Sequence, residues 1–272
     1  MSVLLHLSDS HFGTEVPAVM AALARLVASE NPSLMVASGD ITQRARRSEF
    51  ARARAFFDQL AVPTQMVLPG NHDIPLFNPL ARLFHPYANF CRVFGSELEP
   101  VIDLPDWLLI GVNTTRPRRH VDGEVSAAQI ASVKARLAAA KPGQLRIVVT
   151  HQPMHVTQAE DETNLLHGHA AAARAWTEAG ADLLLGGHIH LPFVRMLNER
   201  HPDLERELWV VQAGTALSAR VRHDAPNSIN LLRHVKEDGH CGCLIERWDY
   251  HAASDAFIQA RAYRLTGLGL KE

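Results

Sequence analysis

The N-terminal third of the chain alternates short apolar runs with longer segments of helical periodicity. The apolar runs are Val3–Leu7, Leu34–Ala37 and Met66–Leu68. The segments between them, Val16–Ser29 and Ser48–Leu60, repeat apolar residues at the three- and four-residue spacing of a helix face. This alternation favours parallel strands with helices packed outside them, because each crossover between parallel strands needs a helix-length connection. The sequence therefore predicts an α/β fold.

Later segments extend this alternation and then abandon it. Helical patterns cover residues 78–94, with an interruption near Pro86, 126–140 and 170–179, and strand patterns cover 101–104, 108–112, 145–149 and 183–185. Four strand-like segments then follow without helices, and we expect them to be antiparallel: Leu208–Ala213, Ser228–Leu232, Leu244–Tyr250 and Phe257–Tyr263. No linker divides the 272 residues, so a single domain over 1–272 is expected, with a motif core at 1–195 and a β-rich C-terminal part at 205–265.

A polar cluster follows each of five apolar runs, at the point where the strand is expected to end. The clusters are Asp9-Ser10-His11, Gly39-Asp40, Gly70-Asn71-His72-Asp73, His151 and Gly187-His188-Ile189-His190. In open α/β sheets the carboxyl ends of the strands gather at one edge, where the loops build a site. Seven side chains are therefore expected to converge: Asp9, His11, Asp40, Asn71, His151, His188 and His190.

These seven side chains have the chemistry of a metal centre. Imidazole and carboxylate ligands suit Mn²⁺, Fe or Zn²⁺, and the absence of thiolate argues against a structural zinc. Seven ligands are too many for one tetrahedral zinc, but they suit two metal ions ~3.5–4 Å apart that share a carboxylate. Two such ions keep residual positive charge even beside two carboxylates and a bridging hydroxide, so the site would attract phosphate.

The ordered set Asp-x-His, Gly-Asp, Gly-Asn-His-Asp, His and Gly-His-x-His resembles the calcineurin-like metallophosphoesterase superfamily. The resemblance runs from Asp9 to His190, with all five motifs present in order. Within the superfamily, the pattern looks like the bacterial class III cyclic-nucleotide phosphodiesterases and their relatives, the Icc-like group. The resemblance implies a four-layer α/β/β/α sandwich, with two mixed β-sheets flanked by helices.

The resemblance also implies a role for each motif residue. One metal would be held by Asp9, His11, Asp40 and His190, and the second by Asp40, Asn71, His151 and His188, which makes Asp40 the bridge. His72 corresponds to the histidine that faces the scissile ester without binding metal. Its imidazole could donate a proton to the leaving oxygen or hydrogen-bond the phosphate. Asp73 would either raise the basicity of His72 or cap the turn, and the sequence leaves both roles open.

The expected function is that of a binuclear-metal-dependent phosphoesterase. Such a hydrolase would cleave small phosphodiesters, with a 3′,5′-cyclic nucleotide as first candidate, by attack of a metal-bound hydroxide. A phosphomonoesterase or pyrophosphatase, or a nuclease, of the same superfamily is the alternative. The two ions could be divalent or trivalent Mn, Fe or Zn, because the same ligands accept each of them. A scaffold that had kept only the fold would normally lack ligands, and none is missing.

Several basic residues are candidates for contact with a phosphoester substrate. Arg44 follows the Gly39-Asp40 cluster, and Arg116, Arg118 and His120 occupy a loop after a strand end, where substrate contacts are common. Solvated side chains are the alternative for all four. Farther along the chain, Arg220 and Arg222 lie in a polar segment between strands. They could reach the site or a subunit contact, and the sequence does not decide between these.

Composition restricts the class of partner and the compartment. The formal net charge of −2 argues against the long basic groove of a nuclease, so nucleic acid is not an expected partner. No apolar run approaches the ~20 residues that span a bilayer, and no signal peptide is visible, so a cytoplasmic protein without a membrane partner is expected. A homodimer is an expectation from relatives alone. Cys241 and Cys243 receive no predicted role.

Overall fold

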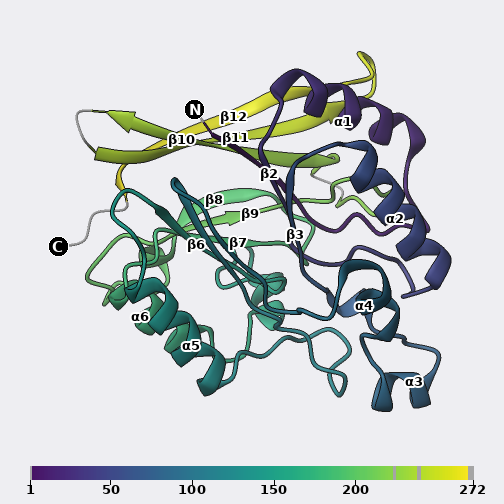
Figure 1. Ribbon diagram of the computed structural model, residues 1–272, viewed down its shortest axis with the longest axis horizontal. Helices are drawn as coiled ribbons and strands as arrows, with labels where there is room; N and C mark the ends of the chain where they lie inside the picture. Colours follow the sequence, from purple (N-terminus) through teal and green to yellow (C-terminus); the bar gives the residue numbers. More distant parts are fainter. Residues whose placement is uncertain (1, 223–224, 238–239, 269–272) are drawn as a thin grey trace.

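The computed structural model describes residues 2–222, 225–237 and 240–268. In these residues the strands form two six-stranded sheets, which lie face to face between two layers of helices (Figure 1). Both sheets mix parallel and antiparallel pairs, so the expected α/β/β/α sandwich with two mixed sheets is confirmed. Within the predicted β-rich part, residues 223–224 and 238–239 lie outside the described residues, as do residues 1 and 269–272 at the ends of the predicted domain.

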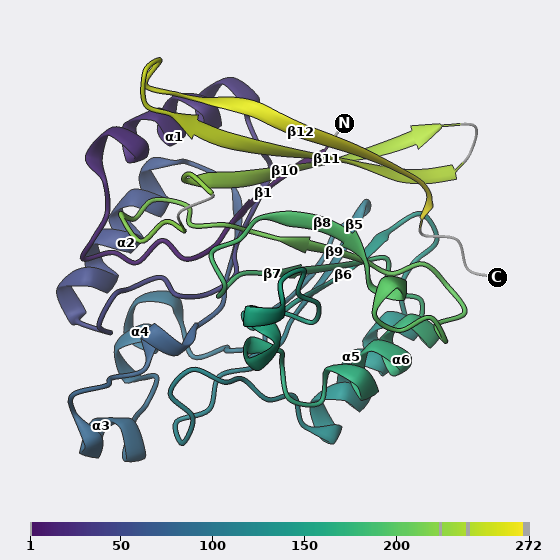
Figure 2. The same cartoon turned by 180° about the vertical axis from the view of Figure 1, so that it is seen from behind.

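The first sheet has the strand order β12-β11-β10-β1-β2-β3. Its strands are β1 (Val3–Leu7), β2 (Leu34–Ala37), β3 (Thr64–Val67), β10 (Ser228–Glu237), β11 (His240–His251) and β12 (Ala256–Leu268). Strands β1 to β3 are parallel and are joined by α1 (Pro17–Glu30) and α2 (Arg47–Gln59), as the alternating pattern predicted. Strands β10 to β12 are antiparallel, and β10 pairs with β1, so the C-terminal part of the chain completes this sheet (Figure 2).

The second sheet has the strand order β4-β5-β6-β7-β9-β8. Its strands are β4 (Val101–Asp103), β5 (Trp107–Gly111), β6 (Leu145–Val149), β7 (Leu183–Gly186), β8 (Phe193–Met196) and β9 (Trp209–Gln212). The expectation that the strand near 208–213 joins the antiparallel group was wrong, because β9 lies in the second sheet, where it is parallel to β7 and antiparallel only to β8. Its continuous apolar run suits a strand that is covered on both faces. Strand β8 was not predicted, because this short edge strand has little apolar periodicity.

Two helices cover the outer face of each sheet (Figure 1). Helices α5 (Ala127–Ala138) and α6 (His169–Glu178) pack on the second sheet, opposite α1 and α2 on the first. The helix predicted over 78–94 is two helices, α3 (Pro79–Phe84) and α4 (Ala88–Phe94), with the expected break at Pro86. In the part of the chain that the structure describes, no helix is long and apolar enough to cross a membrane.

Side-chain alternation along the strands builds the layers. In β1, Leu5 and Leu7 pack against α1 and α2, whereas Leu4 points into the space between the sheets. In β6, Ile147 occupies that same central layer, and Val148 packs under α5 and α6. Because both faces of these strands are buried, their sequences are mostly apolar and do not alternate, with His6 in β1 and Arg146 in β6 as the polar exceptions.

The register of the strands brings their carboxyl ends to one edge of the molecule. Leu7 of β1 pairs with Ala37 of β2, and Ala37 with Val67 of β3. In the other sheet, Val149 of β6 pairs with Leu185 of β7. The polar clusters start within three or so residues of these aligned ends, so the fold itself delivers them to a common place.

A buried ion pair joins the beginnings of β6 and β7. The Asp182 carboxylate accepts hydrogen bonds from the backbone nitrogen of Arg146 at 2.8 Å and from its Nε and Nη2 at 3.1 Å. Both side chains are almost inaccessible, at 4% and 1% exposure. A buried ion pair is costly to break, because removal of one partner leaves an uncompensated charge in the interior.

We therefore expect Asp182→Ala to lower the free energy of unfolding by about 3–5 kcal/mol. Urea denaturation followed by circular dichroism measures this change. The matched control is Asp203→Ala, which removes the partner of Arg174 from an exposed ion pair of 2.8 Å and should leave the urea midpoint unchanged. Equal midpoints for the two variants would contradict a structural role for the buried pair.

Candidate metal centre

Two glycines allow the loops after β2 and β3 to approach each other. Gly39 has a φ of +112°, and a Cβ there would lie 2.4 Å from Nδ1 of His151. Gly70 has an ordinary φ, but its Cβ would lie 2.1 Å from the backbone nitrogen of Asp40. Any larger residue at either position would push apart the side chains that the site needs together.

Asp73 ties these same two loops together. Residues Asn71–Asp73 form a single 3₁₀ turn, and the Asp73 carboxylate accepts hydrogen bonds from the backbone nitrogens of Gly70, Ile41 and Thr42 at 2.8–3.0 Å. Among the described residues no hydrogen bond joins Asp73 to the His72 ring, whose Nδ1 lies 3.0 Å from the carbonyl oxygen of Gln43. The sequence left Asp73 either to raise the basicity of His72 or to cap the turn. The contacts of Asp73 are those of a residue that caps the turn.

Five of the seven predicted ligand residues have a left-handed backbone conformation. Their φ angles lie between 40° and 76°, at Asp9, His11, Asp40, His188 and His190. Residues other than glycine rarely adopt such angles, because the Cβ crowds the backbone. Strained backbone of this kind persists only where the surrounding structure imposes it, and it clusters at functional sites.

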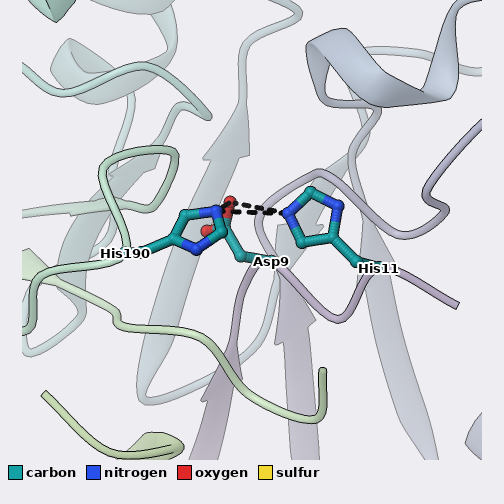
Figure 3. A group of neighbouring side chains, drawn as sticks. All are labelled: Asp9, His11 and His190. Atoms are coloured by element: carbon teal, nitrogen blue, oxygen red, sulfur yellow. Dashed lines mark hydrogen bonds and ion pairs between the residues drawn. The ribbon is translucent and has the colours of Figure 1, made fainter. Parts of the chain in front are cut away.

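The first group of converging side chains contains Asp9, His11 and His190 (Figure 3). Oδ1 of Asp9 lies 3.2 Å from Nε2 of His190 and 3.7 Å from Nε2 of His11, and the two histidine Nε2 atoms are 3.2 Å apart. The residues come from the loops after β1 and β7, so this group joins the two sheets.

The second group contains Asn71, His151 and His188. Oδ1 of Asn71 lies 3.2 Å from Nε2 of His151 and 3.1 Å from Nδ1 of His188. These residues come from the loops after β3, β6 and β7. The second group, like the first, therefore draws on both sheets.

Asp40 stands between the two groups, with one carboxylate oxygen toward each. Its Oδ2 lies 3.7 Å from Nε2 of His11, and its Oδ1 lies 3.3 Å from Nε2 of His151. Oδ1 also accepts a hydrogen bond of 2.8 Å from the backbone nitrogen of His72. This is the placement that a carboxylate shared by two cations requires.

Backbone carbonyl groups orient two of the histidine rings. Nδ1 of His151 lies 3.0 Å from the carbonyl oxygen of Ser38, and Nδ1 of His190 hydrogen-bonds the carbonyl oxygen of Arg220. A ring that donates its Nδ1 proton to a carbonyl presents the lone pair of Nε2 on its other side. In both residues Nε2 is the atom that faces the clustered carboxylates.

The electrostatics of the cluster favour a bound cation. Burial lowers the pKa of His11 to about 3 and that of His188 to about 4, so both rings are neutral near pH 7 and retain a lone pair. Burial also opposes a charge on His151, but the Asp40 carboxylate outweighs it and raises the pKa of His151 to about 9. In the metal-free protein, a proton on His151 therefore provides part of the positive charge that stabilises the Asp40 carboxylate. A bound cation would provide that charge in its place.

One buried acceptor in the cluster supports the same conclusion. Oδ1 of Asp9 is inaccessible to solvent and accepts no hydrogen bond among the described residues; its contacts are ion pairs of 3.2 Å with His190 and 3.7 Å with His11. An unpartnered buried polar atom is costly unless something else satisfies it. A metal ion would satisfy this oxygen, and the imidazole and carboxylate donors around it fit the expected pair of metals.

The four predicted substrate contacts lie in two different settings. Arg44 and His120 line a cavity of about 360 Å³ beside His72. Arg116 does not line it, because its guanidinium hydrogen-bonds the carbonyl oxygen of Asn113 and so supports its own loop. Arg118 is exposed and does not line the cavity either.

The structure brings two further side chains to the site: Gln43, which sequence reasoning missed, and Arg220, whose place it left open. Arg220 Nη1 lies 3.1 Å from Nε2 of His72 and 3.1 Å from Oε1 of Gln43. The sequence left Arg220 between the site and a subunit contact, and the structure places it at the site. No local sequence pattern could have identified Arg220 as a site residue. Its loop is 209 residues from His11 in the chain, and only the tertiary fold brings the two side chains together.

The sequence model of the calcineurin-like phosphoesterase family matches residues 2–192 of the chain. Among characterised sequences, a probable cyclic nucleotide phosphodiesterase from a Synechococcus strain is 25% identical over 166 residues. That match covers 61% of this chain and 60% of the relative, so the chain spans less than two thirds of the relative's length.

Solved structures show the same fold. A dimetal phosphatase from Danio rerio superposes with a TM-score of 0.66 at 13% identity, over 99% of both chains. A purple acid phosphatase from yellow lupin seeds (Lupinus luteus) superposes with a TM-score of 0.69 at 13% identity, over 97% of this chain and 53% of the phosphatase chain. Vacuolar protein sorting 29 from Cryptosporidium parvum superposes with a TM-score of 0.52 at 13% identity, over 97% of this chain and 98% of that protein. Proteins with such different names share the fold, so the fold alone does not decide the activity.

Asp40→Ala is expected to abolish the binding of both metal ions, because it removes the one carboxylate placed toward both groups. Elemental analysis of the purified, metal-loaded protein measures the metal content per chain. His72→Ala is the control and should keep both ions, since its ring is not among the predicted ligands. Full metal content in Asp40→Ala would refute the bridging assignment.

Metal binding is expected to displace a proton from His151. Its pKa of about 9 keeps the ring protonated at pH 7, whereas a metal ligand must be neutral. Metal affinity should therefore rise with pH, by up to about tenfold per unit below pH 9. Calorimetric titration in two buffers of different ionisation enthalpy measures the protons released. His151→Asn, which offers a neutral oxygen instead, should release fewer, and equal release by the two proteins would contradict this origin.

Proposed function

The chain belongs to the calcineurin-like phosphoesterase family, as its motifs indicated, and from that premise we propose that it is a two-metal phosphodiesterase acting on small organic phosphodiesters. The observation that carries the proposal is the division of the donor atoms into two groups joined by Asp40. A 3′,5′-cyclic nucleotide is the first candidate substrate, and the similarity to a probable cyclic nucleotide phosphodiesterase supports it.

We assign the donor atoms to two metal ions according to the motifs. One ion would be held by Asp9, His11, His190 and Oδ2 of Asp40, and the other by Asn71, His151, His188 and Oδ1 of Asp40. Bound there, the two ions would supply Lewis-acid activation of water and neutralise charge on the phosphoryl oxygens. The mixed imidazole and oxygen ligands accept Mn, Fe or Zn.

His72 is the residue that we assign to proton transfer or to hydrogen bonding of the phosphate. The backbone nitrogen of His72 is held by Asp40, and Nδ1 of the ring lies 3.0 Å from the carbonyl oxygen of Gln43. A ring that donates from Nδ1 accepts its second proton at Nε2. From that atom it can donate to the leaving oxygen, a contribution of roughly 10²–10⁴-fold in rate for a well-placed acid.

The cavity beside His72 supports an organic ester substrate. Ile74, Leu76 and Val121 give it apolar walls, and Arg44 and His120 contribute polar atoms. Apolar walls contribute binding energy to a carbon-rich substituent and none to the charged end of pyrophosphate. A cavity of about 360 Å³ suits the second ester group of a small diester, not a long polymer.

A parallel assay of bis(p-nitrophenyl) phosphate, 3′,5′-cyclic AMP, p-nitrophenyl phosphate and pyrophosphate, each with Mn²⁺, Fe²⁺ and Zn²⁺, tests the proposal. We expect diester turnover to exceed monoester turnover by tenfold or more, on the order of 1.4 kcal/mol in activation free energy. Asp40→Ala, purified in parallel, is the control for contaminating phosphatase and should be inactive. Monoester turnover far above diester turnover would replace the proposal with a phosphomonoesterase.

A further inference from the structure

The backbone of Arg220 is held against the metal-binding loops. Its segment follows β9 and runs beside the loop after β1, where the nitrogen of Ala216 donates to the carbonyl oxygen of Ser8 at 3.0 Å, and that of Ala219 to Thr14 at 2.9 Å. The carbonyl oxygen of Arg220 accepts the Nδ1 proton of His190. Arg220 thus orients the predicted ligand His190 through its main chain. The fixed position of this backbone restricts where the Arg220 side chain can lie.

The guanidinium of Arg220 reaches the site through a single nitrogen. Nη1 lies 3.1 Å from Nε2 of His72, 3.1 Å from Oε1 of Gln43 and 3.4 Å from Nδ1 of His11. Its Nε and Nη2 make no hydrogen bond to any described part of the chain. One edge of the guanidinium, the edge that forms paired hydrogen bonds with phosphate oxygens, therefore has no protein partner.

The charge of Arg220 is also uncompensated by the protein. Across residues 2–222, 225–237 and 240–268, no carboxylate forms an ion pair with it. Arg222, two residues farther along, pairs instead with both oxygens of Asp161 at 2.9 Å. Arg220 is half-buried, has no carboxylate partner among the described residues, and contacts Gln43 and His72, which both line the cavity. This is the electrostatic environment of an anion-binding residue.

Metal binding would change the contact between Arg220 and His11. A metal ion on Nε2 of His11 leaves the ring proton on Nδ1, so Nδ1 can no longer accept a hydrogen bond. Guanidinium nitrogens are donors only, so Nη1 and Nδ1 would then face each other as two donors at 3.4 Å. Metal binding would therefore remove the acceptor that His11 offers to Arg220.

We propose that Arg220 binds the phosphate of the substrate, with its Nε–Nη2 edge donating two hydrogen bonds to non-bridging oxygens beside His72. The inference rests on the proposed function, because it takes a phosphoester as the ligand. It adds to that function a positive charge that the protein itself provides. Inorganic phosphate is not a product of diester hydrolysis, but it carries the same kind of non-bridging oxygens and should bind the same edge.

The test compares Arg220→Gln and Arg220→Lys with the matched control Arg222→Gln, which removes the same charge from the same segment. Calorimetric titration of the metal-loaded proteins with inorganic phosphate measures binding without turnover, and elemental analysis checks the metal content. Arg220→Gln should keep its metal, bind phosphate at least about tenfold more weakly, and lose about 10²-fold in kcat/KM for bis(p-nitrophenyl) phosphate. Arg220→Lys should lie between it and the wild type. Arg222→Gln should bind phosphate within about threefold of the wild type, because the Arg222 guanidinium contacts Asp161 and not His72.

Chemical rescue provides a readout that a packing role would not change. Added guanidinium ion, well below denaturing concentrations, should restore part of the activity of Arg220→Ala and none of that of Arg222→Ala. Phosphate affinity in Arg220→Gln equal to that of the wild type would overturn the proposal. Loss of metal from Arg220→Gln would also overturn the proposal, as would phosphate binding by Arg222→Gln that is weakened as much as that of Arg220→Gln. Either result would assign Arg220 to holding its own loop in place.

Failure of this inference can be told apart from failure of the proposed function. An active wild type with an unaffected Arg220→Gln variant would remove only the role of Arg220. A wild type that hydrolyses no phosphoester, but binds phosphate through Arg220, would remove only the proposed activity. A wild type that neither hydrolyses phosphoesters nor binds phosphate would overturn both.

Discussion

The carboxylate of Asp40 is the contact on which the candidate site depends, because its two oxygens face two different groups of side chains. Oδ2 faces His11 and Oδ1 faces His151, and these histidines belong to different sheets. Several local features serve this one placement. Gly39 and Gly70 remove side chains that would keep the loops apart, and Asp73 ties the loop after β3 to the backbone beyond Asp40. The sandwich of two sheets is, in this sense, a frame that holds one carboxylate between two sets of ligands.

The same placement has a cost in local stability. Predicted ligands such as Asp9 and His190 adopt left-handed backbone conformations, and the buried Oδ1 of Asp9 accepts no hydrogen bond among the described residues. Each feature is unfavourable alone and is tolerated only where tightly packed surroundings impose it. Bound cations would offset this cost by satisfying this oxygen and by reducing the repulsion between the buried carboxylates of Asp9 and Asp40. The metal centre is thus expected to contribute to stability as well as to chemistry.

The substrate side of the site has a different origin. The predicted metal ligands follow the ends of strands whose register is set by the sheets, whereas His120, Val121 and Arg220 lie in loops farther from any strand end. Loops tolerate change without loss of the fold, so one frame can serve many phosphoesters. That separation explains why family membership identifies the reaction class and leaves the substrate to be argued from the cavity and from Arg220.

The amino-acid sequence alone determined the strand–helix alternation, the five polar clusters and the metal chemistry of the seven converging side chains, since these follow from periodicity and residue type within short windows. The resemblance of the motifs supplied the four-layer sandwich and the two ligand sets. Only the tertiary structure decided that β9 is parallel, that Asp73 caps its turn, that Arg116 supports its own loop and that Arg220 reaches His72. Each of these depends on contacts between residues far apart in the chain. Periodicity and composition carry no information about such contacts, because a loop's path is set by what it packs against.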